Sequence, residues 1–121
     1  MAADRLTLIE VAREIDRLAR EARDGKTRRE DLGGSSFTIT SLGKLGGLFA
    51  TPVVNYPEVG ILFVPAMKKR PIVVGDEIRI GHVMDLSLSF DHRVINGADG
   101  AEFTQAVISV LQEPDRLFLE M

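Results

Sequence analysis

One apolar run constrains the fold of this chain more than any other segment. Residues 59–66 read VGILFVPA, a continuous apolar stretch with the length of a β-strand. Such a run is typical of a strand in a sheet that is covered on both faces, because both rows of its alternating side chains avoid water. We therefore expect a buried strand here, with other elements packed against its sheet.

Two amphipathic helices are expected, one on each side of the strands in sequence. Residues 7–26, TLIEVAREIDRLAREARDGK, place apolar side chains at helical spacing, and Thr7 with Glu10 forms a capping-box pattern. A second helix is predicted from about Ala98 to Gln112, where Pro114 stops it. We expect one buried face on this helix, formed by Phe103, Ala106, Val107, Val110 and Leu111.

The strands lie between these two helices. Residues 35–41, SSFTITS, alternate apolar and hydroxyl side chains, which predicts a strand with two different faces. PIVV and EIRIGHVM, residues 71–74 and 77–84, flank Gly75-Asp76, which predicts a tight hairpin. We expect the second hairpin strand to continue through DLSLSF, residues 85–90. The order of elements predicts an α/β fold, a two-layer sandwich of mixed sheet with helices on one face.

The composition excludes several classes of function. The net charge of −3 and the pI of about 5.4 disfavour a nucleic-acid-binding surface, which would carry a basic patch. The apolar runs are too short to cross a membrane, so we expect no membrane partner either. Without cysteine the chain has no disulfide, thiolate nucleophile or cysteine-ligated metal. We expect a protein of the cytoplasm.

The cluster around His92 admits two interpretations. In SFDHRVINGADG, residues 89–100, His92 lies between Asp91 and Arg93, and Asn96-Gly97 follows four residues later. His92 is either a catalytic base held by its neighbours or part of a polar turn between a strand and a helix that Asn96 caps. Spacing alone favours the structural interpretation. For His82, which lies within a predicted strand and has no partner nearby in sequence, we also expect a structural role.

Two other kinds of site have little support in the sequence. The glycine-rich stretch 42–47 is not a P-loop, because it lacks the first glycine and the final hydroxyl residue of that motif. The residue types of a zinc site are present in His82, Asp85, Asp91 and His92. Their spacing matches no recognised ligand pattern, so we expect no metal.

Four sequence blocks resemble one family. SLSFDHRVINGADGAEF, residues 87–103, is similar to the His-Arg-x-x-Asp-Gly signature of the dihydrolipoamide acyltransferases, the E2 components of 2-oxo acid dehydrogenase complexes. Residues 33–47, 51–62 and 113–121 resemble further blocks of that family, in the same order. The resemblance implies a partial chloramphenicol-acetyltransferase-like fold. It covers the C-terminal half of the catalytic domain, so we expect residues 1–121 to form one domain, without lipoyl or subunit-binding domains.

The resemblance also assigns catalytic roles to particular positions. It implies that His92 is the general base and that the hydroxyl of Thr40 stabilises the oxyanion. Asn96 stands where most members of the family carry aspartate, although some carry asparagine. Imidazole suits the reaction, because its pKa of about 6.5 lies closer than that of a carboxylate to the thiol pKa of about 8.5.

Further residues are expected to bind the substrate or to support the histidine. The resemblance places Ser41, Val64 and Ala66 near the coenzyme A site. Asp91 and Arg93 are expected to hold the histidine motif through an ion pair or hydrogen bond.

The resemblance implies substrates and partners as well. Coenzyme A is the expected substrate, and the lipoyl group is expected on a separate domain or chain. We expect a homotrimer, or a larger assembly of trimers, in which His92 of one chain meets Thr40 of the next. Its partners would be the E1 component and dihydrolipoamide dehydrogenase. Two alternatives stay open: an inactive core or assembly fragment of the same family, and a small-molecule acetyltransferase of the chloramphenicol type.

Overall fold

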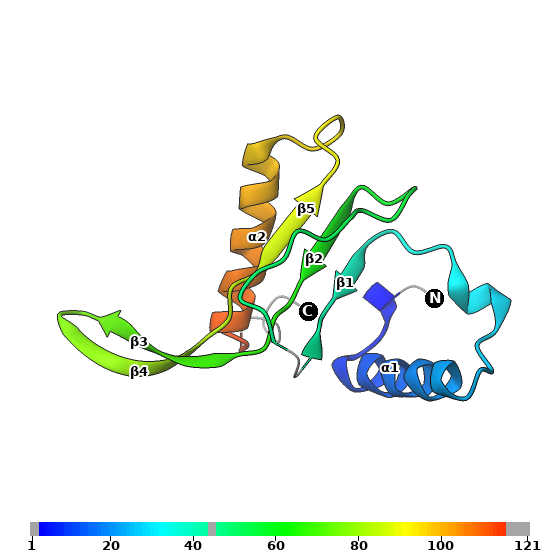
Figure 1. The fold of residues 1–121 in the computed structure, drawn as a ribbon, viewed down its shortest axis with the longest axis horizontal. Coiled ribbons are helices and arrows are strands. Elements are labelled where there is room, and N and C mark those ends of the chain that lie inside the picture. Colours follow the sequence, from blue (N-terminus) through cyan, green and yellow to red (C-terminus); the bar gives the residue numbers. More distant parts are fainter. Residues whose placement is uncertain (1–2, 44–45, 116–121) are drawn as a thin grey trace. The chain divides into compact units, whose positions relative to one another are not determined.

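The computed structural model describes residues 3–43 and 46–115 and divides into two compact units, residues 1–34 and 35–121. The end of the last block that resembles the acyltransferases, residues 116–121, lies outside the described residues. The two units are built from different elements (Figure 1). The first is helical, and the second contains all the strands of the described chain.

The first unit is built around helix α1, Leu8–Arg23, between the 3-10 helices η1, Ala3–Arg5, and η2, Arg29–Leu32. The predicted capping box is confirmed: the Thr7 hydroxyl accepts from the N–H of Glu10, whose carboxylate accepts from the N–H of Thr7. These bonds satisfy two backbone donors that the first turn of a helix leaves without partners.

One arginine holds the polar side of this unit together. Arg17 forms ion pairs with Glu14 and Glu21 on α1 and lies 3.8 Å from the carboxylate of Asp31 in η2. Because the side chains are about 20–30% exposed, water screens these pairs only in part. The apolar side chain of Ile15 on the same helix stays 62% exposed within the unit.

The second unit contains a three-stranded mixed sheet. Its strands are β1, Thr38–Thr40, β2, Gly60–Phe63, and β5, Ser87–Phe90, in the order β1-β2-β5. The central strand β2 runs parallel to β1 and antiparallel to β5. All four of its residues are buried, which confirms the strand predicted from the apolar run. The mixed sheet and α/β class are also confirmed.

The remaining strands form a separate hairpin (Figure 1). Strands β3, Lys68–Val74, and β4, Glu77–Val83, pair antiparallel across the predicted turn, where Gly75 has a φ of +62°. The prediction that the second hairpin strand continues through residue 90 is wrong. β4 ends at Val83 because its partner is β3, whereas β5 pairs with β2 in the other sheet.

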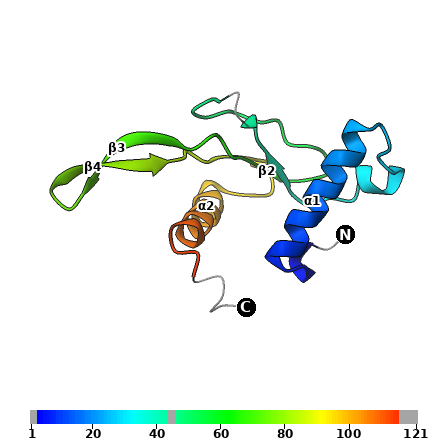
Figure 2. The same cartoon turned by 90° about the horizontal axis from the view of Figure 1, so that it is seen from below.

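Helix α2, Gly97–Gln112, contacts β5 and lies on one face of its sheet (Figure 2). The closest approach is at Gly100, where an added Cβ would lie 2.6 Å from the ring of Phe90. The predicted buried face of α2 is not buried in the described chain: Phe103 is 43% and Leu111 55% exposed. α2 has 16 residues and β5, the strand that it contacts, has four, so the strand is too short to cover the whole helix.

Candidate active site

The backbone around His92 forms a turn anchored to the central strand. Directly after β5, the N–H of Asp91 donates to the carbonyl of Val59 at 2.9 Å. The carbonyl of Asp91 then accepts from the N–H groups of Val94 and Ile95, both at 3.0 Å. The residue before His92 is therefore fixed at both its N–H and its carbonyl.

The imidazole of His92 is exposed and packs beside an aromatic ring. Its centroid lies 5.6 Å from that of Phe90, with the two rings tilted by 45°. Phe90 is in turn in contact with the position of Gly100 on α2. The histidine thus has a packed side and an accessible side, as a group that reacts with an incoming substrate requires.

Asp91 and Arg93 form an ion pair on either side of the histidine in sequence. The carboxylate of Asp91 accepts from the Arg93 backbone N–H at 3.0 Å, from Nε at 2.9 Å and from Nη2 at 2.6 Å. These bonds lower the pKa of Asp91 to about 2. Asp91 is therefore ionised near neutral pH, and its bonds to Arg93 span the position of His92.

Asn96 caps helix α2. Its side-chain oxygen accepts from the N–H of Asp99 at 3.0 Å, and its carbonyl accepts from the N–H of Gly100 at 3.1 Å. The helix therefore begins where the sequence predicts. The bond also fixes the orientation of the amide four residues after His92.

The second group of candidate residues lies around the end of β1. Thr40 is half-buried, and its carbonyl accepts from the N–H of Val64 at 2.9 Å, so these two residues are adjacent. Ser41 is exposed, and its hydroxyl accepts from the N–H of Gly43 at 3.1 Å. Ala66 follows on the same segment as Val64 and is half-buried.

The fold does not bring Thr40 and His92 together within one chain. Thr40 pairs with Phe63, which in turn lies opposite Ser87 at the start of β5. His92 follows the other end of β5. At about 3.3 Å per residue, the length of this strand alone separates the two groups by about 10 Å. The two groups therefore lie at opposite ends of β5.

Glu58 is a buried carboxylate to which the sequence reasoning gave no role. It is 6% exposed and accepts hydrogen bonds from the hydroxyls of Ser35 and Thr38. These bonds lower its pKa, although its burial acts in the opposite direction. Its two hydroxyl partners lie 23 and 20 residues away, so no local pattern could have placed them beside it. The nearest signal was an acidic residue directly before the apolar run.

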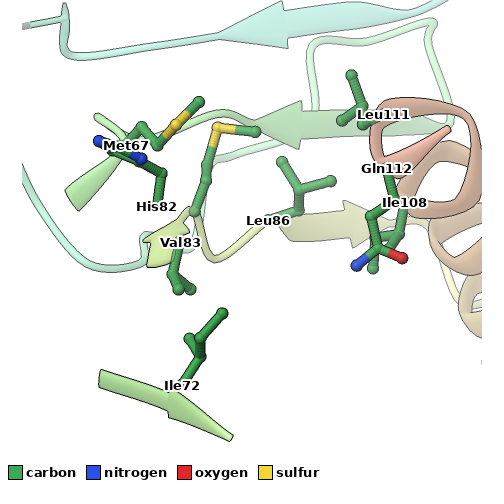
Figure 3. Close-up of a pocket in the computed structure, with 9 residues that line it drawn as sticks. Met67, Ile72, His82, Val83, Leu86, Ile108, Leu111 and Gln112 are labelled. Atoms are coloured by element: carbon green, nitrogen blue, oxygen red, sulfur yellow. The ribbon is translucent and has the colours of Figure 1, made fainter. Parts of the chain in front are cut away.

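Several hollows lie on this unit, and two of them are lined by the candidate ion pair or by a histidine. A groove of about 330 Å³ lies between the ion pair of Asp91 with Arg93 and the segment of Val53, Val54, Tyr56 and Glu58. A mainly apolar pocket of about 390 Å³ lies between the base of the hairpin and the end of α2 (Figure 3). His82 lines this second pocket from β4.

The described residues contain neither a metal cluster nor a membrane-spanning helix. Within residues 3–43 and 46–115, no three histidine, aspartate or glutamate side chains gather in a way that could hold a metal ion. No helix in that part of the chain is both long and apolar enough to cross a bilayer.

The sequence matches a family profile along nearly its whole length. The profile is described as "2-oxoacid dehydrogenases acyltransferase (catalytic domain)" and matches residues 1–119. The lipoamide acyltransferase component of the branched-chain alpha-keto acid dehydrogenase complex of Pseudomonas aeruginosa is 52% identical over 90% of this chain. The dihydrolipoyllysine-residue succinyltransferase component from Bartonella vinsonii is 44% identical over 98%. The chain spans 26% and 29% of these two relatives.

A solved structure shows the same fold. The dihydrolipoamide acetyltransferase of Azotobacter vinelandii superposes on 89% of this chain with a TM-score of 0.85 and 42% identity. The matched region is 44% of that protein's crystallised chain. That enzyme was studied for the role of a serine, a histidine and an asparagine in its catalytic mechanism.

Proposed function

Because this chain belongs to the acyltransferase family of the 2-oxo acid dehydrogenase complexes, we propose that it transfers an acyl group between dihydrolipoamide and coenzyme A. One observation carries the assignment of its site. Thr40, His92 and Asn96 occur in the same order and at the same separations as the serine, histidine and asparagine of the Azotobacter vinelandii enzyme. The exposed imidazole on its anchored turn supports the same assignment.

The first chemical step is removal of the proton from the attacking thiol. His92 takes the proton of the coenzyme A thiol, and the thiolate attacks the carbonyl carbon of the acylated dihydrolipoamide. For unperturbed groups, proton transfer from a thiol to an imidazole is uphill by only about 3 kcal/mol, because their reference pKa values differ by about 2 units. Asp91 cannot replace the histidine, because its pKa of about 2 makes it a much weaker base.

The second requirement is stabilisation of the negative oxygen that the attack creates. The hydroxyl of Thr40, from a neighbouring chain, donates a hydrogen bond to this oxygen. When the intermediate collapses, the carbon–sulfur bond to the dihydrolipoyl group breaks. The leaving sulfur receives the proton from the imidazolium of His92, which restores the neutral base.

The remaining side chains bind the substrate and support the base. Ser41 follows Thr40, Val64 is bonded to it and Ala66 lies two residues further along, which suits a binding site for the coenzyme A thiol arm. Asp91, Arg93 and Asn96 keep the turn and the helix start in place around His92. The larger share of identical residues with the branched-chain component favours a branched acyl group over succinyl.

The proposed assembly is a trimer, or a larger particle built from trimers. The separation of Thr40 and His92 supports it, because the site needs two chains. Residues 1–121 would act as one domain, the C-terminal half of the catalytic domain. The protein would work in the cytoplasm with a lipoyl group on a separate domain or chain, an E1 component and dihydrolipoamide dehydrogenase.

A second candidate function is a core fragment that assembles without catalysing. The chain matches 44% of the Azotobacter vinelandii catalytic chain, and many of its apolar side chains are exposed. Both observations fit an assembly role. The reported relatives are components of 2-oxo acid dehydrogenase complexes, which disfavours a small-molecule acetyltransferase.

Acyl transfer to free dihydrolipoamide tests the proposed function. Acetyl-, succinyl- and isobutyryl-coenzyme A serve as donors for the chain and for a His92→Ala variant. We expect turnover that is fastest with isobutyryl-coenzyme A and that falls by about 10²–10⁴-fold in the variant, the range for loss of a general base. Equal rates in the two proteins would refute the role of His92. No turnover in either would favour the core fragment.

A further inference from the structure

Glu58 is a buried and charged side chain two residues before the central strand. Its exposed fraction is 6%, and each of its carboxylate oxygens accepts from a different hydroxyl, that of Ser35 or that of Thr38. The bond to Thr38 measures 2.5 Å. These donors lower the pKa of Glu58, so that the carboxylate stays ionised near neutral pH. A buried charge is tolerated only when it is bonded in this way.

One hydroxyl partner of Glu58 belongs to the strand that carries Thr40. Thr38 and Thr40 are the first and last residues of β1, and strand geometry places their side chains on the same face. β1 pairs with β2 through only three residues, so few backbone bonds define its register. The bond from Glu58 to Thr38 adds a side-chain constraint to that register. A slip by one residue would turn Thr40 to the opposite face.

The segment of Glu58 also anchors the turn that carries His92. Val59, the next residue, accepts the N–H of Asp91 at 2.9 Å. Glu58 and Asp91 line the same groove of about 330 Å³. A shift of the backbone at Glu58 would therefore move the acceptor on which the histidine turn rests.

From these contacts we propose that Glu58 is a positioning residue for both halves of the acyl-transfer site. Through Thr38 it holds the strand of Thr40, and through Val59 it holds the turn of His92. The contribution of Glu58 to catalysis rests on the proposed function. Its effect on the two segments does not, because that effect depends only on contacts within one chain.

Removing one hydroxyl donor at a time is the sharpest test. Replacing Glu58 with alanine would open a cavity and endanger the fold, whereas Ser35→Ala and Thr38→Val each remove one donor and leave the carboxylate in place. Ser36→Ala is the matched control, because Ser36 is the exposed neighbour of Ser35. The first measurement is amide hydrogen exchange by NMR.

The exchange data separate positioning from general stability. We expect the protection of the Asp91, Val94 and Ile95 amides to fall about tenfold in Ser35→Ala and Thr38→Val, the size expected for loss of one bond to a buried charge. The α2 amides should change by less than about twofold, and Ser36→Ala should resemble the parent. The proposal is overturned if the turn amides do not change, or if turn and helix amides lose the same factor.

Steady-state kinetics then test whether Glu58 contributes to catalysis. Misplaced catalytic groups should lower kcat about tenfold in Ser35→Ala and Thr38→Val, with the KM for coenzyme A within about twofold. Glu58→Gln should retain more activity than either, since its amide can accept from one hydroxyl and donate to the other. An unchanged kcat in Ser35→Ala and Thr38→Val overturns the contribution of Glu58 to catalysis. If the parent chain shows no turnover, the proposed function fails, and the exchange data still decide the role of Glu58.

Discussion

Thr40 offers the simplest change at the residue scale, because serine keeps its hydroxyl and valine removes it. Thr40→Val keeps the branched shape and removes the proposed oxyanion donor, so kcat should fall by about 10²–10³-fold. Thr40→Ser keeps the donor and should stay within about tenfold of the parent. Steady-state acyl transfer measures both variants. Thr51→Val, on an exposed loop, serves as the control, and equal activity of Thr40→Val and the parent would exclude the oxyanion role.

Asp91 should give the folded chain a defined acid sensitivity. Bonds from Arg93 lower its pKa from 3.8 to about 2 in the folded state. A group with a depressed folded pKa contributes stability that is fully present above its unfolded pKa and is lost as the pH falls through the folded value. The contribution of Asp91 should therefore be complete above about pH 4 and disappear towards pH 2.

A pH series of thermal unfolding checks this expectation. The midpoint of Asp91→Asn should lie below that of the parent at pH 5 to 7, and the two midpoints should converge between about pH 4 and 2. Asp76→Asn, at the tip of the hairpin, controls for the removal of any carboxylate. A difference that stays constant down to pH 2 would mean that the ion pair with Arg93 does not lower the pKa.

At the scale of elements, two glycines of the last helix provide a matched pair. A Cβ at Gly100 would lie 2.6 Å from the Phe90 ring, whereas a Cβ at Gly97 would meet nothing within 4 Å. Gly100→Ala should therefore destabilise the fold by about 1–3 kcal/mol through overpacking. Gly97→Ala should be neutral or slightly stabilising, because alanine has the higher helix propensity.

Denaturant unfolding of the two variants separates these expectations. Gly100→Ala should also displace Phe90, whose ring packs beside His92, and so alter the NMR signals of the imidazole. The signals of His82, on β4, should not change. Equal stability of both alanine variants would show that α2 does not approach β5 as closely as Gly100 indicates.

The elements that could be predicted from the sequence are those defined by neighbouring residues. The capping box of Thr7 with Glu10, the helix start at Asn96 and the hairpin at Gly75 each depend on contacts within a few positions. The break between β4 and β5 was missed, because alternation of side chains does not reveal which strand a segment pairs with. Glu58 was missed for the same reason, since the two hydroxyls that it binds lie far away in sequence.

In the candidate site, too, the sequence predicted what neighbouring residues define and missed what depends on distant segments. The pattern around His92 located the histidine, its ion pair and the helix cap within one short segment. Thr40 was located only through the resemblance to the acyltransferases. Its distance from His92 is a property of strand order and register, which the pattern of one segment cannot supply.

At the scale of the whole molecule, the described chain exposes more apolar surface than a self-contained fold of its size requires. Among the large hydrophobic side chains of the described residues, the buried ones are Ile61, Leu62 and Phe63. By contrast Val53 is 87%, Tyr56 90% and Ile80 81% exposed. Exposed apolar patches of this kind mark surfaces that associate with other chains. The proposed site between chains requires such an association.

Complementation between two inactive variants tests that assembly directly. His92→Ala lacks the base and Thr40→Val lacks the oxyanion donor, so each variant alone should be nearly inactive. If every site combines His92 of one chain with Thr40 of the next, a variant can supply the group that its neighbour lacks. In randomly mixed trimers, half of the chains carry each intact group, so about a quarter of the sites should be complete.

The mixing experiment has a clear contrary outcome. Co-expression of the two variants in equal amounts, followed by the acyl-transfer assay, should restore about a quarter of the parent activity, because only sites with both groups intact turn over. Mixing the purified variants without subunit exchange should restore none, which controls for contamination by active protein. If Thr40 and His92 acted within one chain, every chain would lack one of them. No co-expressed mixture would then exceed its parents, and the strand register that separates the two groups would not describe the working site.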